Sequence, residues 1–550
     1  MKLKYTITAL LAAGLLGTTS CVNDLDVFPL DPNVNSSNVA YDSAESYMQA
    51  LSKIYSVWAF SGQNGAGDSD ISGLDAGNTV LLRCWFTLQE NTTDEAKCAW
   101  NDAWVSSINQ ITWTTAQVES IEGAYQRAMF VVSLVNDYMK YVGDAPENSE
   151  LYAAEARFCR ALAYYTLMDL FARPPFITED NYSLMPTQLS RAELFEWIES
   201  ELLDIYNTLP TNPEYGRAGR YAVDALLSRM YLNAPVYTGS QTNSNGENYY
   251  TMCITRCNNI IKGDVYSLAD NYAELFMADN GENANAKKEI IFPICADGET
   301  GQSYGIGAII CGSRSTNEAD PLTDGCVGWD GFRSTGNLVR MFEFESSNEN
   351  DWTADNILDK RGIFYSKNRS IDIVTSPQQT FTSEGWAVYK FSNVGSDGTP
   401  GSNTTFPDTD FPLFRLGEIY LNYAEAVARG GQGGSTATAV SYINALRQRG
   451  YGDDNHNISE NWLTASVAVG GKTGSIQYGN LLAERSRELY WEATRRTDLI
   501  RFGVFTSGNY VWSAKGGVIT GVGVDDHYNV FPIPTTDMSV NSSLTQNEGY

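Results

Sequence analysis

Three aromatic residues in polar, glycine-containing segments are the side chains of this sequence that most clearly suggest a chemistry. They are Trp100 in CAWNDAW, Tyr304 in GQSYGIG and Trp329 in GCVGWDGF, in a chain that is 12% aromatic. A sugar ring has apolar C–H faces and a polar rim, so a sugar site pairs flat aromatic rings with amide, carboxylate or guanidinium groups. We therefore expect these rings to stack on a carbohydrate; burial in the core is the alternative for each.

Polar residues suitable for the rim of such a site occur as Asp75, Arg83 and Asn101. A second polar set consists of aspartates in loop-like segments, Asp279 in MADNGEN with Asp408 and Asp410 in PDTD. Carboxylates in loops are the hard oxygen ligands that calcium prefers. These three aspartates are candidate ligands of a structural Ca²⁺, and solvated turn residues are the alternative.

Other kinds of reactive centre have little support in the sequence. The chain has only two histidines, and the eight cysteines after Cys21 show no framework spacing, which argues against zinc and Cys–His nucleophiles. We expect mostly buried thiols, with room for one or two disulfides. The 66 acidic residues single out no pair as the acid and base of a glycosidase. No catalytic residue and no catalytic cofactor is therefore predicted.

A dense group of charges near the C-terminus has a structural interpretation. In ERSRELYWEATRRTDLIRFG, a continuous helix would carry Glu484, Glu488 and Glu492 on one face with arginines nearby. Pairs at this spacing stabilise helices and are far more often structural than catalytic. We expect an ion-pair network here.

The overall charge and hydropathy limit the partners. A formal net charge of -29 argues against nucleic acid and against anionic membrane surfaces, because repulsion opposes the contact. The chain is 43% hydrophobic, and no apolar run after the N-terminal segment is long enough to span a bilayer. A large water-soluble globule with a neutral ligand is expected.

The N-terminus indicates export with lipid attachment. Lys2 and Lys4 precede an apolar stretch from Ile7 to Leu16, which is shorter than the roughly 20 residues needed to cross a membrane. Residues 1–20 are interpreted as a lipoprotein signal peptide, Cys21 as the acylated residue and 21–40 as a tether, although Thr18 stands where a leucine is usual. Acyl chains anchor a protein durably when more than one is attached. A secreted protein with an ordinary cysteine is the alternative.

Helical periodicity covers much of the remaining chain. Ser190 and Glu193 form a capping box before Leu194, Ile198 and the apolar positions that follow at helical spacing. Similar patterns occur in 153–171, 218–237, 414–431 and 437–452, the last expected to end at Gly450. Small and aromatic residues alternate on several of these helices, as in the antiparallel pairs of tetratricopeptide repeats. The predicted fold is mainly α, with paired helices forming a scaffold; an irregular helical globule is the alternative.

The segment from about 266 to 410 differs in character. Glycine, asparagine, serine and aspartate dominate it, and two short apolar runs, 289–294 and 306–311, are expected to be strands. Loops of such length are usually functional. We predict one domain over 41–550, with a helical scaffold at about 41–265 and 411–550 and a loop-rich insertion of minor β content that carries the ligand site.

Five sequence blocks span essentially the whole chain: CVNDLDVFPLDP, PLFRLGEIYLNYAEA, NALRQRG, ERSRELYWEATRRTDLIRFG and FPIPTTDMSVNSSLTQNEGY. Together they resemble the SusD family of surface glycan-binding lipoproteins. The resemblance implies a tetratricopeptide-like scaffold, no enzymatic activity and anchoring through Cys21 at the outer-membrane surface. It also implies a SusC-like TonB-dependent porin as partner, together with other surface glycan-binding lipoproteins and an amylase.

The stretches TTDEAKCAW, YGIGAIICGSR and FPDTDFPLFRL are similar to the starch-binding founder of that family. By this similarity Trp100, Tyr304 and Trp329 would cradle starch or maltooligosaccharides, and Asp75, Arg83 and Asn101 would bond to sugar hydroxyls. Cys98 departs from the pattern, and a changed spacing after Trp100 weakens the match at Asn101. A SusD-like binder of another polysaccharide, a helical glycoside hydrolase and a peptide-binding module remain the alternatives.

Overall fold

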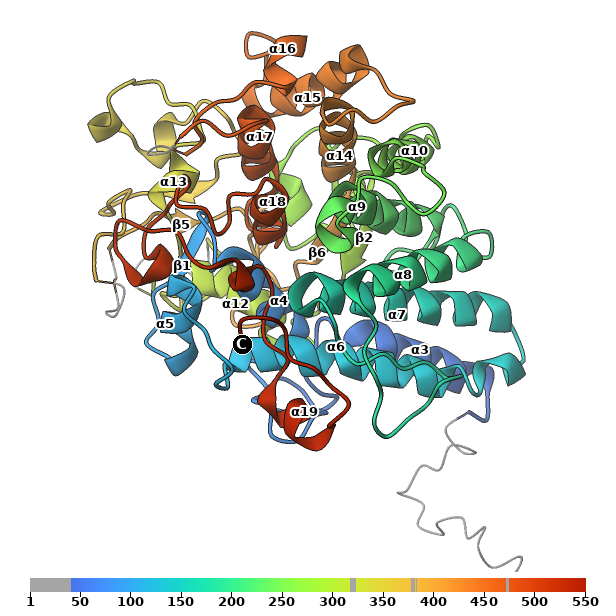
Figure 1. The fold of residues 1–550 in the computed structure, drawn as a ribbon. Helices are drawn as coiled ribbons and strands as arrows, with labels where there is room; N and C mark the ends of the chain where they lie inside the picture. Colours follow the sequence, from blue (N-terminus) through green and yellow to red (C-terminus); the bar gives the residue numbers. More distant parts are fainter. Residues whose placement is uncertain (1–40, 317–322, 377–380, 382, 471–473) are drawn as a thin grey trace, which may run out of the picture.

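The computed structural model describes residues 41–550 apart from 317–322, 377–380, 382 and 471–473 (Figure 1). The signal peptide, Cys21 and the 21–40 tether expected from the sequence lie outside the described residues. Within these residues, no helix combines the length and apolar character that crossing a membrane requires.

Helices form most of the regular structure. Their bounds are α3 Ala44–Ser56, α4 Leu81–Glu90, α5 Ala103–Gln110, α6 Glu119–Tyr138, α7 Ser149–Phe171, α8 Arg191–Ile205, α9 Arg220–Thr238, α10 Tyr249–Ile261, α11 Ala284–Lys287, α12 Tyr304–Ile310, α13 Gly336–Val339, α14 Leu416–Ala428, α15 Thr436–Tyr451, α16 Glu460–Leu463, α17 Gly479–Leu489, α18 Arg495–Arg501 and α19 Thr535–Val540.

The strands among the described residues are short and pair two by two. They are β1 Ala96–Cys98, β2 Ile290–Ile294, β3 Phe332–Ser334, β4 Phe364–Tyr365, β5 Ala387–Val388 and β6 Phe411–Arg415. The antiparallel pairs are β1 with β3, β2 with β6 and β4 with β5. The mainly α fold predicted from periodicity is confirmed.

Successive helices pack side by side to form the scaffold. In Figure 1, α6, α7, α8, α9 and α10 follow one another up one side of the molecule, and α14 and α15 continue the series. The helix α8 shows why the sequence folds this way. Ser190 accepts a hydrogen bond from the amide of Glu193 and Glu193 reaches back, while Leu194, Ile198, Leu202 and Ile205 are buried.

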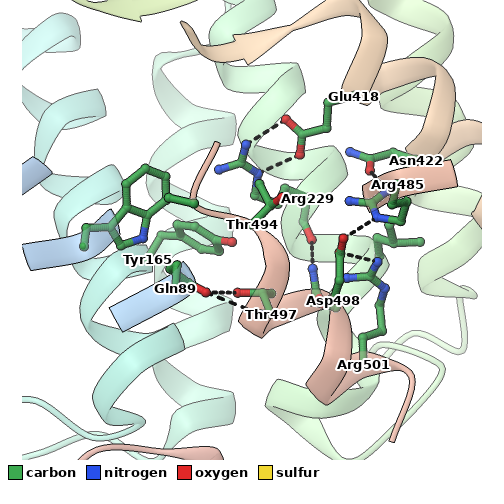
Figure 2. Close-up of a pocket in the computed structure, with 14 residues that line it drawn as sticks. Gln89, Tyr165, Arg229, Glu418, Asn422, Arg485, Thr494, Thr497, Asp498 and Arg501 are labelled. Atoms are coloured by element: carbon green, nitrogen blue, oxygen red, sulfur yellow. Dashed lines mark hydrogen bonds and ion pairs between the residues drawn. The ribbon is translucent and has the colours of Figure 1, made fainter. Parts of the chain in front are cut away.

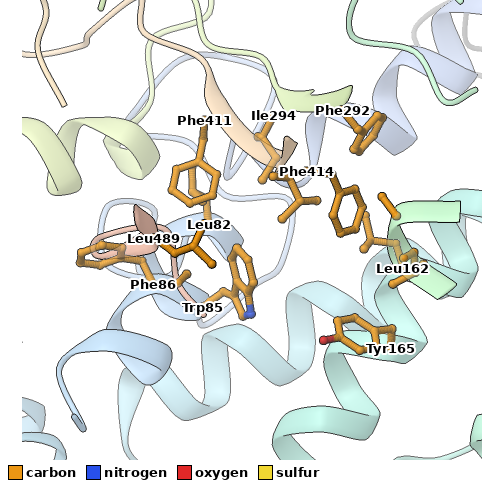
Figure 3. Packing of buried hydrophobic residues seen from close by; sticks show 14 of the residues in the cluster. Leu82, Trp85, Phe86, Leu162, Tyr165, Phe292, Ile294, Phe411, Phe414 and Leu489 are labelled. Carbon is orange, nitrogen blue, oxygen red and sulfur yellow. The ribbon is translucent and has the colours of Figure 1, made fainter. Parts of the chain in front are cut away.

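The core joins the scaffold to the loop-rich segment. Figure 3 shows Trp85 and Phe86 of α4 near Phe411 of β6, with Trp85 and Phe411 in edge contact at 6.1 Å between ring centroids. Phe292 of β2 packs on Phe414 at 6.4 Å. Each large apolar side chain buried in this way contributes about 1.5–3 kcal/mol to stability. The loop-rich segment is therefore held by the same core as the helices.

Two local expectations were wrong. Residues 306–311 do not form a strand: Ile306–Ile310 belong to α12, whose N-cap Ser303 accepts from the amide of Gly305, and Cys311 begins a 3₁₀ turn. All six residues are buried, and a short apolar run has the same pattern in a buried helix as in a buried strand. The helix expected to end at Gly450 instead ends at Tyr451 and is capped by Gly452, which has a φ of 82°.

The predicted continuous helix through Glu492 is also corrected. α17 ends at Leu489, and Trp491 and Ala493 have φ of 65° and 55°, so the chain turns before α18. The ion-pair network nevertheless forms, because Arg415 bonds to Glu488 at 2.6 Å and to Glu492 at 2.7 Å from either side of the break. The network is buried and structural, as the sequence indicated.

Candidate functional site

The three aromatic residues selected from the sequence lie together. The indole N–H of Trp100 donates to the backbone carbonyl of Trp329 at 2.6 Å. The rings of Tyr304 and Trp329 are 6.0 Å apart between centroids, at 57° to one another. All three side chains are partly exposed. We call this group the aromatic platform; the rings of Tyr304 and Trp329 within it are tilted relative to one another.

Strand pairing creates this proximity. β1 pairs antiparallel with β3, with Cys98 opposite Phe332, and the amide of Ala99 donates to the carbonyl of Gly331 at 2.8 Å. Trp100 follows β1 and Trp329 precedes β3, so the ladder places their backbones side by side. Tyr304 enters from the first residue of α12.

Glycines allow the rings to lie close to the backbone. A Cβ on Gly331 would lie 2.4 Å from the Trp100 ring, and one on Gly307 would lie 3.3 Å from the ring of Trp329. Trp100 also packs on Phe332 at 5.2 Å between centroids. The orientation of Trp100 is thus fixed by a hydrogen bond, by a ring contact and by the missing side chain of Gly331.

Asp75 and Arg83 join the aromatic platform through Gly77. The Arg83 guanidinium carbon lies 5.3 Å from the centroid of the Trp100 ring, and Nη1 donates to the carbonyl of Gly77 at 3.1 Å. The Asp75 carboxylate accepts from the amide of Gly77 at 2.9 Å, and a Cβ on Gly77 would lie 3.2 Å from the Tyr304 ring. Burial lowers the pKa of Arg83. An exposed carboxylate and a buried guanidinium therefore lie beside the rings.

Asn101 is exposed and follows Trp100 directly. It lies near the aromatic platform because it is the next residue after Trp100 in the chain.

Beside Asp75, the structure contains a cleft of about 340 Å³ that sequence reasoning missed, lined also by Asp102, Trp104 and Glu119. Burial, and then the charge of Asp75, raise the pKa of Glu119. The cleft extends the polar surface away from the aromatic platform.

Phe406 is another residue that the sequence did not single out. Its ring contacts that of Tyr304 at 5.2 Å between centroids, in an edge-on arrangement. The sequence contains a signal for it, because Phe406 lies in the loop-like segment TTFPDTD. The other three rings were chosen by the same criterion, an aromatic residue in a polar loop. Phe406 packs edge-on against Tyr304.

The three candidate calcium ligands line one pocket of about 450 Å³. Asp279 accepts from the amide of Ser396 at 2.9 Å, Asp408 from that of Gly298 at 2.8 Å and Asp410 from that of Ala296 at 2.8 Å. The pocket is acidic; its carboxylate residues are Asp279, Glu282, Asp297, Asp397, Asp408 and Asp410.

The chemistry of this pocket fits an oxygen-coordinated cation. Burial raises the pKa of Asp410 to about 6, and the nearby charges of Glu282 and Asp408 add to the effect. A divalent cation would relieve this repulsion. Over the described part of the chain, however, no three or more acidic, histidine or cysteine side chains are already arranged to hold a metal.

A third hollow, drawn in Figure 2, has a different character. It holds only about 10 Å³ and is enclosed by buried polar side chains. Arg229 pairs with Glu418 at 2.7 Å, and Asp498 accepts from Arg485 at 2.7 Å. A space of this size admits about one water molecule. It is a structural network between helices.

Comparison with family models gives two consecutive matches. Residues 235–550 match the model described as the SusD family, and residues 78–232 match one described as starch-binding associating with outer membrane. Among curated proteins, the chain is 33% identical to the starch-binding protein SusD of Bacteroides thetaiotaomicron over the full length of both chains. A SusD-like protein of Bacteroides ovatus is 22% identical over 68% of each chain.

Solved structures share the fold. Surface glycan-binding protein A from Bacteroides fluxus aligns with a TM-score of 0.66 and 20% identity, covering 92% of this chain and 99% of its own. Surface glycan-binding protein A from B. thetaiotaomicron, in complex with laminarihexaose, aligns with a TM-score of 0.65 and 18% identity over the same shares. The full-length identity to SusD and the family model covering more than half of the sequence lead to one conclusion: the chain belongs to the SusD family.

Proposed function

We propose that this protein is a non-catalytic cell-surface glycan-binding protein that captures starch and maltooligosaccharides on the aromatic platform. The observation that carries the proposal is the meeting of Trp100, Tyr304 and Trp329 at one partly exposed surface, with Asp75 and Arg83 beside them. The relative with 33% identity is named a starch-binding protein. Family membership and the chemistry of the site therefore support the same ligand class.

The geometry suggests how a glucan would be held. The faces of successive glucose rings would lie on the tilted indole and phenol rings, while the Asp75 carboxylate accepts from sugar hydroxyls and the Arg83 guanidinium donates to them. α-Glucan chains curve in solution, so a bent, preformed surface binds them with little loss of conformational freedom. A flat glucan such as cellulose would contact fewer rings at once. Affinity should rise with chain length as each ring adds a contact.

The cellular setting is part of the proposal. Cys21 would carry the lipid anchor at the outer-membrane surface, and a SusC-like TonB-dependent transporter would receive the glycan for import. The family-model description that refers to the outer membrane supports this location. Bound Ca²⁺ in the Asp279, Asp408 and Asp410 pocket would hold the loops that reach Phe406, since Asp408 lies two residues beyond it.

A different polysaccharide is the second candidate ligand. It is favoured by the structural neighbour solved with laminarihexaose, which shares the fold with 18% identity. The scaffold is thus compatible with more than one glycan. The identity of the ligand depends on the rings and polar groups at the platform.

Calorimetry of the mature protein against maltooligosaccharides of increasing length, cyclodextrin, laminarihexaose, levan and xylan tests the proposal. We expect heat only with the α-glucans and affinity that rises with chain length. If only one of the other glycans binds, that glycan and not starch is the ligand. No binding to any glycan would reject the glycan function, and release of reducing sugar from starch would indicate a hydrolase.

A further inference from the structure

Two cysteines lie at the base of the aromatic platform. Cys311 follows α12, which begins at Tyr304, and Cys326 lies three residues before Trp329. Both side chains are fully buried. All the cysteines among the described residues are free thiols in the structure.

The contacts around these residues bring the two segments together. The thiol of Cys311 lies 3.7 Å from the carbonyl oxygen of Thr404, and the amide of Val327 donates to that same oxygen at 2.9 Å. The amide of Trp329 donates to the carbonyl of Cys311 at 2.9 Å. These bonds hold the residues on the C-terminal side of Cys326 against Cys311, and each thiol is close enough to shift the pKa of the other. Backbone hydrogen bonds therefore keep the two cysteines close together.

We infer that Cys311 and Cys326 form a disulfide in the exported protein and that this bond fixes the spacing of Tyr304 and Trp329. The formation of the bond depends on export, and its effect on ligand affinity rests on the glycan function proposed above. The cross-link would join the segment that positions one ring to the segment that carries the other.

The pair is chemically suited to oxidation. Both thiols are fully buried in the folded protein, so the exchange takes place during folding, while they are still accessible. The Cys326 thiolate attacks the disulfide of a thiol oxidase in the compartment to which the protein is exported, and one sulfur of the oxidase leaves. Cys311 then loses its proton and displaces the second sulfur. Two protons and two electrons pass from the cysteines to the oxidase, which becomes a dithiol.

A second pair of thiols provides an internal control. Cys253 likewise raises the pKa of Cys257 and both are fully buried, but both lie on α10, four residues apart. Side chains at this helical spacing have Cβ atoms about 5–6 Å apart, whereas a disulfide needs about 3.5–4.5 Å. Cys311 and Cys326 come from separate segments and have no such restriction. We expect Cys253 and Cys257 to remain thiols.

The first experiment asks whether the bond forms. The full chain is secreted into an oxidising periplasm, alkylated under denaturing conditions without reductant, digested and analysed by mass spectrometry. A peptide linked through Cys311 and Cys326, with Cys253 and Cys257 alkylated, is the expected result. Alkylation of Cys311 and Cys326 in the secreted protein would overturn the inference.

Thermal melts with and without reductant provide a second measurement. Reductant should lower the melting temperature of the wild type by about 2–4 °C, because a closed loop restricts the unfolded chain. The C311S/C326S variant should melt at the same temperature in both conditions, and C253S/C257S should respond as the wild type does. An equal response of the two double variants would contradict the assignment.

The role at the platform is tested by retention on starch. C311S/C326S should bind about two- to fivefold more weakly than the wild type, with C253S/C257S unchanged. If C311S/C326S binds as tightly as the wild type, the bond does not set the ring spacing. If the oxidised wild type itself fails to bind any glycan, the proposed function is wrong, and the mass spectrum still decides whether the disulfide exists.

Discussion

The indole N–H of Trp100 donates to the backbone carbonyl of Trp329 at 2.6 Å, although the two residues are 229 positions apart. This bond turns the edge of one ring toward the backbone that carries the other. It also satisfies the only polar atom of the Trp100 side chain, whose ring packs on Phe332 and beside the Arg83 guanidinium.

Removal of either indole should nearly abolish binding. Trp100→Ala and Trp329→Ala each delete one stacking surface, and we expect affinity for starch to fall by about tenfold or more. Affinity gel electrophoresis in starch measures the effect. Trp462→Ala, in α16 at the top of Figure 1 and apart from α12 near the middle, is the matched control and should migrate as the wild type does. Wild-type retardation of both platform variants would exclude a role for the indoles.

Displacing a ring without removing it should have a smaller effect. A methyl group at Gly331 would lie 2.4 Å from the Trp100 ring, so Gly331→Ala must shift the indole. We expect starch affinity to fall several-fold, by calorimetry, while the far-UV circular dichroism stays unchanged. Gly143→Ala places its methyl in open space and serves as the control. Equal affinities of the two variants would show that the position of Trp100 is unimportant.

The buried carboxyl of Glu90 should make stability depend on pH. Burial and then the charge of Glu95 raise the pKa of Glu90 well above 4.5. Neutral Glu90 can donate to Glu95. The unfolded carboxyl ionises near pH 4.5 while the folded one stays protonated, so stability is greatest below that pH and declines as pH rises toward the folded pKa.

Glu90→Gln keeps a hydrogen-bond donor that faces Glu95 but replaces the ionisable carboxyl by a neutral amide. It should raise the free energy of unfolding at pH 7.5 and change it little at pH 4. Urea unfolding at the two pH values measures this difference. Glu147→Gln, which removes an exposed carboxyl, controls for net charge. A loss of stability in Glu90→Gln at pH 7.5 would contradict the prediction.

The buried ion-pair network should be sensitive to the loss of one member. Arg415 pairs with Glu289 at 3.0 Å, Glu488 at 2.6 Å and Glu492 at 2.7 Å, with its side chain 1% exposed. Arg415→Met removes the one cation that all three carboxylates share, although Arg449 and Lys390 still pair with them, and it should cost about 3–5 kcal/mol in denaturant unfolding.

Arg340→Met is the surface counterpart, because Arg340 pairs with Glu349 and Asp372, whose side chains are 44% and 46% exposed. It should cost about 1 kcal/mol or less. Similar losses in the two variants would mean that burial does not govern the strength of these pairs.

Calcium, if bound in the acidic pocket, should raise the melting temperature. We expect chelator to lower it in the wild type and to have no effect in Asp408→Asn, with Asp180→Asn, an exposed aspartate, behaving as the wild type. Protons compete with the ion at Asp410, whose pKa is about 6, so calcium affinity should fall as pH drops below 6. No shift with chelator at neutral pH would reject a structural ion.

The sequence by itself determined the mainly α fold, because helical periodicity and caps are local signals; the capping box of Ser190 and Glu193 forms as expected. It also selected Trp100, Tyr304 and Trp329, because aromatic rings in polar loops differ visibly from helical stripes. Tertiary structure alone decided that these rings meet, since pairing of β1 with β3 joins segments more than 200 positions apart and leaves no local pattern. For the same reason, the helix at 306–310, the turn after Leu489 and the contact between Cys311 and Cys326 emerged only from packing.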